Sequence, residues 1–298
     1  MMRSGADTGT DIGSLAPCLV IPHYDHAEAL GRSLPALLGA GWPIFLVDDG
    51  SSPGERLRLE ACVEDVAPLA CATSTVSADG TLTLLRLPRN LGKGAAVLHG
   101  CAAARLAGFT HAVQIDADGQ HDIADLPSML ALCAREPTAI VSGEPVFDDG
   151  APAARVHGRK LTTAMIAIET LGGGIRDGLC GYRVYPLAAV ETIAARFPIA
   201  SRMGFDTDML VKASWLGIPI RFVPTRVSYP ADGRSHFHYL RDNLALIRLH
   251  LALLGGTLRR TPGLVRRRRL ARARPRSGDR SGNRSGNRSG DGSGDGRT

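Results

Sequence analysis

Residues 113–121 read VQIDADGQH, and this segment carries the strongest indication of fold and chemistry in the chain. Its apolar part predicts a buried strand that ends at Asp116 and Asp118. Residues i and i+2 of an extended chain point the same way, so both carboxylates can face one site. Such a pair favours Mg²⁺ or Mn²⁺, shared with water and substrate phosphates, with Gln120 or His121 as a further ligand. The alternative is an ordinary polar turn, because two aspartates at this spacing are common.

The composition is that of a globular protein with an uneven distribution of charge. The 298 residues are 44% hydrophobic, which suffices for a substantial core, and the net charge is +6. The positive charge is concentrated from Arg259 onward, so nucleic acid is not an expected partner of the body. The six cysteines form no Cys-x-x-Cys pair, which favours a reducing cytoplasm over a zinc site or disulfides. We find neither a secretory signal nor an apolar run long enough to span a membrane.

Apolar segments alternate with helix-like segments along the chain. This alternation predicts an α/β fold with a mainly parallel sheet flanked by helices, in which ligands gather at the carboxyl ends of the strands. Three predicted strands end in polar clusters, at residues 22–26, 48–52 and 116–121, and their convergence indicates a shared nucleotide-type site. The predicted strands are 18–21, 44–47, 82–87, 112–115, 139–142 and 218–223, and the predicted helices are 27–40, 55–66, 95–106, 125–135, 161–171, 209–216 and 239–258.

A lysine flanked by glycines precedes the predicted helix 95–106. Lys93 lies between Gly92 and Gly94, and this arrangement at a helix start favours the binding of an anion. The segment is not a Walker P-loop, because its spacing differs and no serine or threonine follows the lysine. Lys93 is therefore a candidate anion-binding residue.

The C-terminal part combines a largely apolar helix with a basic tail. Arg241 and Arg248 share one face of the predicted helix 239–258, and arginines continue to Arg274, as in segments that lie in a membrane interface. The alternative is a helix packed on the domain with a solvated basic tail. Residues 277–296 repeat Ser, Gly, Asp, Asn and Arg and are expected to be disordered. We expect a flexible leader at 1–16, a single domain at 17–235, an amphipathic helix at 236–260 and a disordered basic tail at 261–298.

Four motifs, taken together, resemble family 2 glycosyltransferases of the GT-A fold. They are VIPHY at 20–24, VDDGS at 47–51, NLGKG at 90–94 and DADGQ at 116–120. Each motif is modestly specific alone, but their order and spacing make the combination strong. The likeness spans residues 17–245 and is closest to the branch that includes dolichyl-phosphate mannose synthase and acts on polyprenyl phosphates.

The resemblance implies a donor in which a sugar is linked to GDP or UDP. Pro22, Tyr24 and Asp49 match positions around the base and ribose. Asp116 matches a residue near the ribose and metal, and Asp118 matches a ligand of Mg²⁺ or Mn²⁺ beside the diphosphate. The expected donor-binding residues are Pro22, Tyr24, Asp48, Asp49, Lys93 and Asp116, and the expected metal ligands are Asp116, Asp118 and Gln120.

On the acceptor side, residues 177–183 are similar to a family segment that has serine in place of Cys180. This likeness makes Arg183 a candidate for the acceptor side of the site. Asp206 and Asp208 lie where many members carry an acidic pair, and either is a candidate catalytic base. The alternative for these two aspartates is capping of the helix that follows them.

The chain also departs from the pattern of this branch. An acidic residue is usual where the chain has His26, and two phosphate-binding cations are missing from their expected places near Pro230. Arg234 and His236 are the candidates to replace those cations.

These features predict an inverting, metal-dependent transfer of a sugar to a lipid-linked or hydroxyl acceptor, in the synthesis of cell-envelope glycans or glycolipids. A hydroxyl acceptor needs a carboxylate base, whereas a lipid phosphate is already anionic. The expected location is the cytoplasm, with peripheral contact at the inner face of an anionic membrane. The alternatives are a non-catalytic protein that binds nucleotide sugars and, with less support, a sugar nucleotidyltransferase, which is expected to carry a glycine-rich, arginine-containing loop after the first strand.

Overall fold

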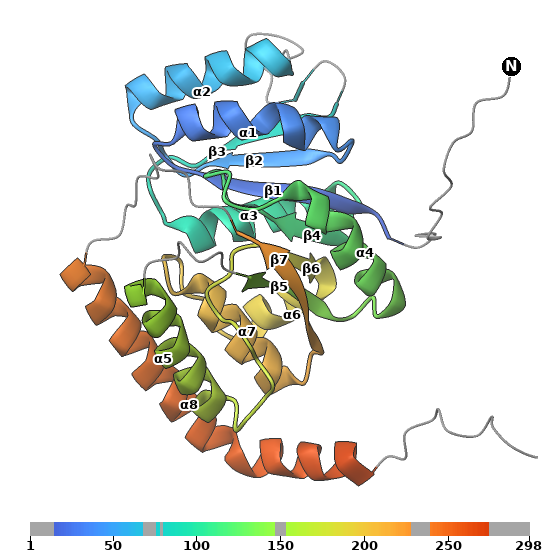
Figure 1. Ribbon diagram of the computed structural model, residues 1–298, viewed down its shortest axis with the longest axis vertical. Coiled ribbons are helices and arrows are strands. Elements are labelled where there is room, and N and C mark those ends of the chain that lie inside the picture. Colours follow the sequence, from blue (N-terminus) through green and yellow to red (C-terminus); the bar gives the residue numbers. More distant parts are fainter. Residues whose placement is uncertain (1–14, 68–75, 78–79, 147–152, 228–238, 274–298) are drawn as a thin grey trace, which may run out of the picture. The chain divides into compact units, whose positions relative to one another are not determined.

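The computed structural model describes residues 15–67, 76–77, 80–146, 153–227 and 239–273, and its centre is a seven-stranded sheet (Figure 1). The strands follow the order β3-β2-β1-β4-β6-β5-β7. β6 runs antiparallel to β4 and β5, and the other neighbouring pairs are parallel. The expected mixed, mainly parallel sheet is confirmed. The strands are β1 (Pro17–His23), β2 (Ile44–Asp48), β3 (Leu82–Arg86), β4 (His111–Gln114), β5 (Ile140–Val146), β6 (Arg183–Pro186) and β7 (Ile220–Arg226).

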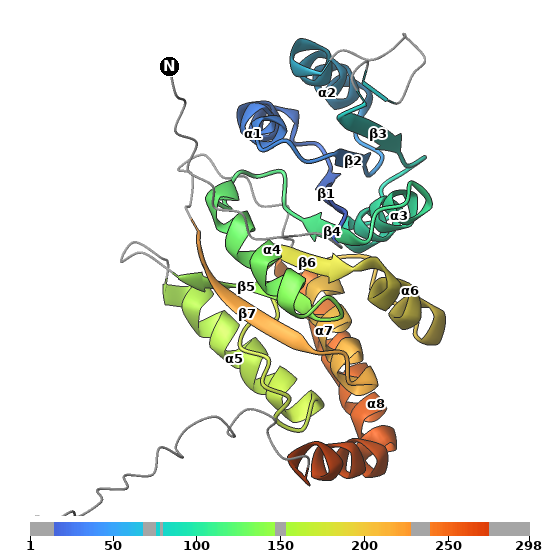
Figure 2. The same ribbon diagram turned by 90° about the vertical axis from the view of Figure 1, so that its right-hand side faces the viewer.

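Helices cover both faces of the sheet, with α3 and α6 on one face and α1 and α4 on the other (Figure 2). The predicted helices are confirmed, with ends that differ by a few residues except at α5, which begins eight residues earlier than expected, at Ala153, and at α8. β6 and α6 were not predicted. The described helices are α1 (Ala27–Gly39), α2 (Pro53–Val66), α3 (Lys93–Leu106), the short η1 (Ile123–Asp125), α4 (Leu126–Arg135), α5 (Ala153–Glu169), α6 (Leu187–Arg196), α7 (Phe205–Leu216) and α8 (Tyr239–Ala273).

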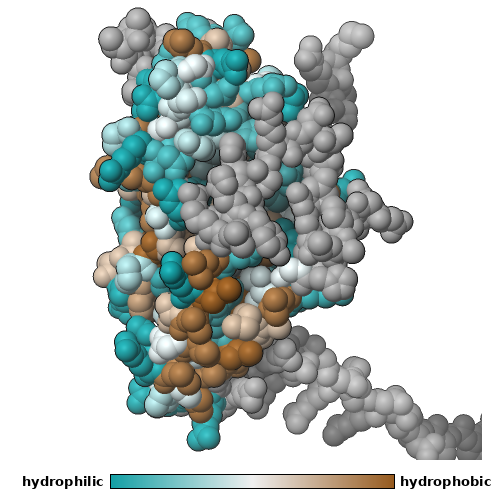
Figure 3. All heavy atoms as spheres, turned by 90° about the vertical axis from the view of Figure 1, so that its left-hand side faces the viewer, coloured by the Kyte–Doolittle hydropathy of each residue, from teal (hydrophilic) through white to brown (hydrophobic). Residues whose placement is uncertain are grey.

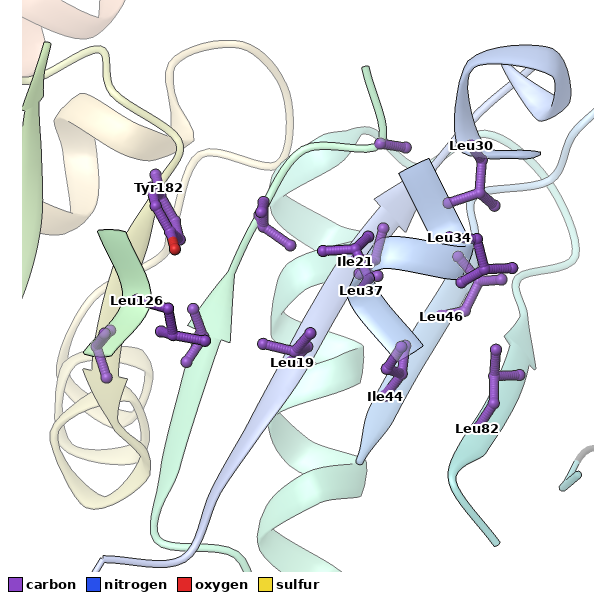
Figure 4. Close-up of a cluster of buried hydrophobic side chains, with 14 of the residues drawn as sticks. Leu19, Ile21, Leu30, Leu34, Leu37, Ile44, Leu46, Leu82, Leu126 and Tyr182 are labelled. Atoms are coloured by element: carbon purple, nitrogen blue, oxygen red, sulfur yellow. The ribbon is translucent and has the colours of Figure 1, made fainter. Parts of the chain in front are cut away.

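The main hydrophobic core lies between the sheet and the helices α1 and α4. Leu19 and Ile21 of β1 pack in one cluster with Leu30 and Leu34 of α1 (Figure 4). Val20, the residue between them, points to the other face, where it lies beside Gly100 of α3. Because β1 is covered on both faces, its sequence is a continuous apolar run rather than an alternating one.

Parallel pairing brings the ends of three strands to one edge of the sheet. The register places Pro22 beside Val47 and His23 beside Asp48, so β1 and β2 end together. Val20 pairs with Gln114, and the chain after β4 therefore continues along the same edge. The three polar clusters that follow these strands are neighbours, as the sequence predicts.

The start of α3 approaches the chain before α7 closely. Gly92, the N-cap of α3, has φ +102°, a conformation that favours glycine, and its backbone lies against the carbonyl of Ser201. A Cβ atom on Gly94 would lie 2.5 Å from the carbonyl oxygen of Ala200 and 2.7 Å from side-chain carbons of Phe205. Glycine at these positions therefore allows α3 to dock where Lys93 can reach residues of α7.

The C-terminal helix is longer than predicted. The predicted amphipathic helix ends at residue 260, whereas α8 continues to Ala273 past Pro262. Leu, Arg and Ala in its last two turns are strong helix formers, which explains the extension. The chain divides into two units, 1–260 and 261–298, and the repeats at 277–296 lie outside the described residues. None of the described helices is long and apolar enough to cross a membrane.

We expect Gly94→Ala to lower the free energy of unfolding by about 1–3 kcal/mol, because its new methyl group would overlap the backbone at Ala200. Gly54 is the matched control, since it is the second residue of α2 and a Cβ there meets nothing within 4 Å. Chemical denaturation of the two alanine variants measures the difference. Equal stability of both variants would contradict the proposed close contact.

Candidate active site

A partly buried lysine, with 21% of its side chain exposed, connects the end of β4 with α7. Lys93 Nζ donates hydrogen bonds to Asp116 Oδ2 at 2.9 Å and to Asp206 Oδ2 at 3.0 Å. Gln114 Nε2 donates to the other oxygen of Asp206 at 3.0 Å. Burial alone would lower the pKa of Lys93, but the two carboxylates outweigh it and raise the pKa above its ordinary value. Lys93 therefore stays charged and holds Asp116 and Asp206 in place.

Gly181 and Arg183 close the protein side of this cluster. A Cβ atom on Gly181 would overlap Asp116 Oδ2 and Lys93 Nζ, so only glycine fits there. Arg183 is completely buried and donates to the carbonyl oxygens of Gly178 and Asp206. These contacts connect the loop before β6 with α7, and the predicted place of Arg183 on the acceptor side stays a prediction.

Asp49 and Asp48 lie at the end of β2 and face the protein interior. The two oxygens of Asp49 accept hydrogen bonds from the backbone amides of Leu91 at 2.7 Å and Gly92 at 2.8 Å. Burial raises the pKa of Asp49, although both amides oppose the shift. Asp48 accepts from the amide of Ser51 at 3.0 Å and is fully buried. Both aspartates order the loops around the site, and their contact with a donor stays a prediction.

Pro22 and Tyr24, by contrast, are partly exposed at the end of β1. Asp25, the next residue, has φ +48° and accepts from the amide of Ser52 at 2.8 Å, which ties the loops after β1 and β2 together. The two predicted donor-binding residues are therefore accessible to solvent at the edge of the sheet where β1 ends.

The residues after β4 fit a divalent cation in their donor chemistry. Asp116 Oδ1 is buried without a hydrogen-bond partner, although Oδ2 is bound by Lys93. Burial and the charge of Asp116 raise the pKa of Asp118 to about 6. A cation between the two carboxylates would coordinate the unpaired oxygen of Asp116 and reduce the repulsion between Asp116 and Asp118.

Further ligands for such a cation would have to come largely from outside the chain. Within the described ranges, no three His, Cys, Asp or Glu side chains gather into a group that could hold a metal ion. The backbone amide of Gln120 donates to Asp118 Oδ1 at 3.1 Å, and the role of the Gln120 side chain as a ligand stays a prediction. Two protein carboxylates with water and phosphate oxygens are the usual way in which Mg²⁺ is held.

Asp206 and Asp208 do not form an acidic pair. Both lie in the first turn of α7, where residues i and i+2 do not share a face. Asp206 points to Lys93, whereas Asp208 is fully buried and accepts from Lys212 Nζ at 2.6 Å and from the amide of Ala200 at 2.7 Å. The geometry supports a structural role for Asp208.

His121 also belongs to this region, although it was predicted only as an alternative to Gln120 as a further metal ligand. Its ring stacks on Tyr182 with 5.2 Å between the centroids, and its Nδ1 atom is buried without a partner. Burial lowers its pKa below the ordinary value, which favours the neutral ring. Gln114 was missed entirely, and the available signal was an amide inside an otherwise apolar strand. Arg234 and His236 lie outside the described residues.

We expect Asp208→Ala to lower the free energy of unfolding by about 3–5 kcal/mol, because it leaves the ammonium group of Lys212 buried without its counter-ion. The double variant Asp208→Leu with Lys212→Met should recover most of this loss, since it removes both charges. Denaturant titration compares the three proteins. A single variant as stable as the parent would contradict the structural role.

Curated relatives of this chain include dolichyl-phosphate glucosyltransferases. The chain is 27% identical over 232 residues to dolichyl-phosphate β-glucosyltransferase ALG5A of Trichomonas vaginalis, which is 72% of this chain and 66% of that protein. It is 26% identical over 187 residues to dolichyl-phosphate β-glucosyltransferase of Dictyostelium discoideum, which is 60% of this chain and 53% of that protein. The chain thus spans less than two thirds of the length of these relatives.

Solved structures with the same fold include glucosyl-3-phosphoglycerate synthase from Mycobacterium tuberculosis. Its complex with uridine diphosphate superposes with a TM-score of 0.58 at 17% identity, over 86% of both chains. Its complex with phosphoglyceric acid gives a TM-score of 0.57 at 17% identity, over 82% of this chain and 80% of that one. The model of glycosyl transferase family 2 matches residues 18–193, more than half of the chain. Because the family model covers more than half of the chain, the chain belongs to glycosyl transferase family 2.

Proposed function

We propose that this chain is an inverting glycosyltransferase that moves a sugar from a nucleoside-diphosphate donor to a lipid-linked phosphate. The observation that carries the proposal is the pair Asp116 and Asp118, which follows a central strand in a family 2 domain and borders the ends of β1 and β2. Ligands of open α/β sheets bind at this edge. Curated relatives named dolichyl-phosphate glucosyltransferases support the lipid-linked acceptor.

Asp116 and Asp118 would hold Mg²⁺ or Mn²⁺, Asp116 through Oδ1, the oxygen that Lys93 does not bind. When bound, the ion supplies positive charge that stabilises the departing nucleoside diphosphate. Lys93 keeps Asp116 ionised and oriented through the 2.9 Å hydrogen bond. The partly exposed Pro22 and Tyr24 line the approach for the donor's base. The complex of one structural neighbour with uridine diphosphate supports UDP as the nucleotide, with GDP as the alternative.

The state of the two candidate bases favours a phosphate acceptor over a hydroxyl acceptor. A hydroxyl group must lose its proton during transfer, which requires an available base. Asp206 is held by Lys93, and Asp208 is held by Lys212. Because a lysine engages each carboxylate, these contacts support an acceptor that needs no base. A lipid phosphate needs no base, because its attacking oxygen is already anionic.

A donor and acceptor panel tests this proposal. The purified chain is given UDP-glucose, UDP-galactose or GDP-mannose, each with a polyprenyl phosphate in detergent or with a soluble alcohol, in Mg²⁺, Mn²⁺ or EDTA. We expect metal-dependent transfer to the polyprenyl phosphate, with a product of inverted anomeric configuration by NMR. Transfer to the alcohol alone would overturn the acceptor. Binding of a donor without any turnover would favour a non-catalytic nucleotide-sugar-binding protein.

We expect Asp118→Ala to reduce transfer by more than about 100-fold with the fold intact, because the cation would lose one of its two carboxylates. Asp122→Asn is the matched control, since Asp122 lies four residues further on, is exposed, and caps η1 through a bond that asparagine can also make. Initial rates report activity, and thermal unfolding reports the fold. Activity of Asp118→Ala within about tenfold of the parent would refute the assignment.

A further inference from the structure

The inner face of α8 is fixed to the domain by polar and aromatic contacts. His250 Nδ1 lies 2.7 Å from Oε1 of Glu169, the buried last residue of α5. Trp215 Nε1 donates to Thr257 Oγ1 at 3.1 Å. A Cβ atom on Gly256 would overlap the Trp215 ring, so glycine allows the helix to approach closely. These contacts determine which side of α8 faces away from the domain.

The opposite face of α8 is apolar and exposed. Leu244, Leu251 and Leu258 are seven residues apart and therefore lie along one stripe, which Ile247 joins as a neighbour of Leu244 and Leu251. We call these four residues the outer face of α8. Their side chains are 47–67% exposed. The neighbouring α5 adds the exposed Leu161 and Ile168. Figure 3 shows hydrophobic residues, in brown, gathered in the lower half of the face that it draws.

Arginines border this stripe on one side. Arg248 and Arg259 are exposed, and each directly follows a member of the outer face. They are eleven residues apart, which is about three helical turns, so they lie on the same border. In all, α8 carries nine arginines and a single acidic residue, Asp242. An apolar stripe with a cationic border is complementary to an anionic lipid surface, where leucines enter the acyl boundary and arginines contact phosphate groups.

This charge pattern disfavours a second copy of the chain as the occupant. A symmetric dimer uses the same patch on both subunits, so it would bring no acidic residue of this patch to the arginine borders. A membrane surface supplies the opposite charge instead. No described helix can cross a membrane, so the stripe would have to lie in the interface rather than span it.

We propose that the outer face of α8 docks the protein on anionic lipid bilayers. The apolar residues insert at the headgroup boundary, and Arg248 and Arg259 contact lipid phosphates. Docking does not depend on the proposed transfer reaction. The role of docking, which is to bring the site to a lipid-linked acceptor, rests on the proposed function.

Vesicle co-sedimentation of the full chain tests this surface. The vesicles consist of phosphatidylcholine alone or with phosphatidylglycerol, at low and high salt. We expect binding to the anionic vesicles that weakens as salt rises. The double variant Leu251→Glu with Leu258→Glu should bind at least about tenfold more weakly. Leu57→Glu on α2 is the matched control, because Leu57 is 68% exposed and Leu258 is 67% exposed; it should bind like the parent.

Two further measurements keep the outcomes distinct. Arg248→Ser with Arg259→Ser should reduce the salt dependence, and donor binding should be the same in all these variants, because none of these residues belongs to the candidate active site. Vesicle binding that is absent, or that the double glutamate variant leaves unchanged, would overturn the proposal. If light scattering instead shows a dimer that the glutamates dissociate, without vesicle binding, the face is an interface between copies. If the parent chain binds vesicles but transfers no sugar, only the proposed function is refuted.

Discussion

The ion pairs of Lys93 hold the candidate site together. One ammonium group satisfies Asp116 after β4 and Asp206 on α7, two carboxylates that belong to elements far apart in the chain. Without it, Asp116 would lose its ion-pair partner, and Asp206 would keep only the longer 3.8 Å contact with Arg183. Removing one partner of a buried pair typically costs about 3–5 kcal/mol, because the remaining charge is uncompensated. Charge balance at Lys93 therefore links the orientation of the site to the stability of the fold.

Steric constraints make this charge balance possible. Lys93 is the first residue of α3, and it reaches α7 because Gly94 lets the helix lie against the chain before α7. On the other side, the backbone of Gly181 covers the pair where a larger residue would overlap Asp116. Glycine at these places lets the backbone lie close to the ion pair, so that the side chains of Lys93 and Asp116 are only 21% and 26% exposed. Partial burial strengthens the attraction between the charged groups.

Local patterns in the sequence were sufficient to predict the strand ends but not the partners of their side chains. Buried parallel strands are continuous apolar runs, so the positions of the three polar clusters followed from the strands alone. The pairing of Lys93 with Asp206 spans 113 residues, and nothing in either segment indicates the other. The same limit applies to Arg183, because its burial depends on β6, a four-residue strand that was not predicted.

The contacts of the two α7 carboxylates with lysines and the exposed outer face of α8 are independent observations that support the same proposed acceptor. An enzyme that acts on a dissolved alcohol needs an available base and has no use for a membrane surface. A lipid phosphate needs no base, and it is confined to the bilayer, where docking raises its effective concentration near the site. Weak docking is sufficient for this purpose, and it also allows release. The four residues of the outer face would supply only reversible attachment, and each nearby arginine would add about 1 kcal/mol that salt can screen.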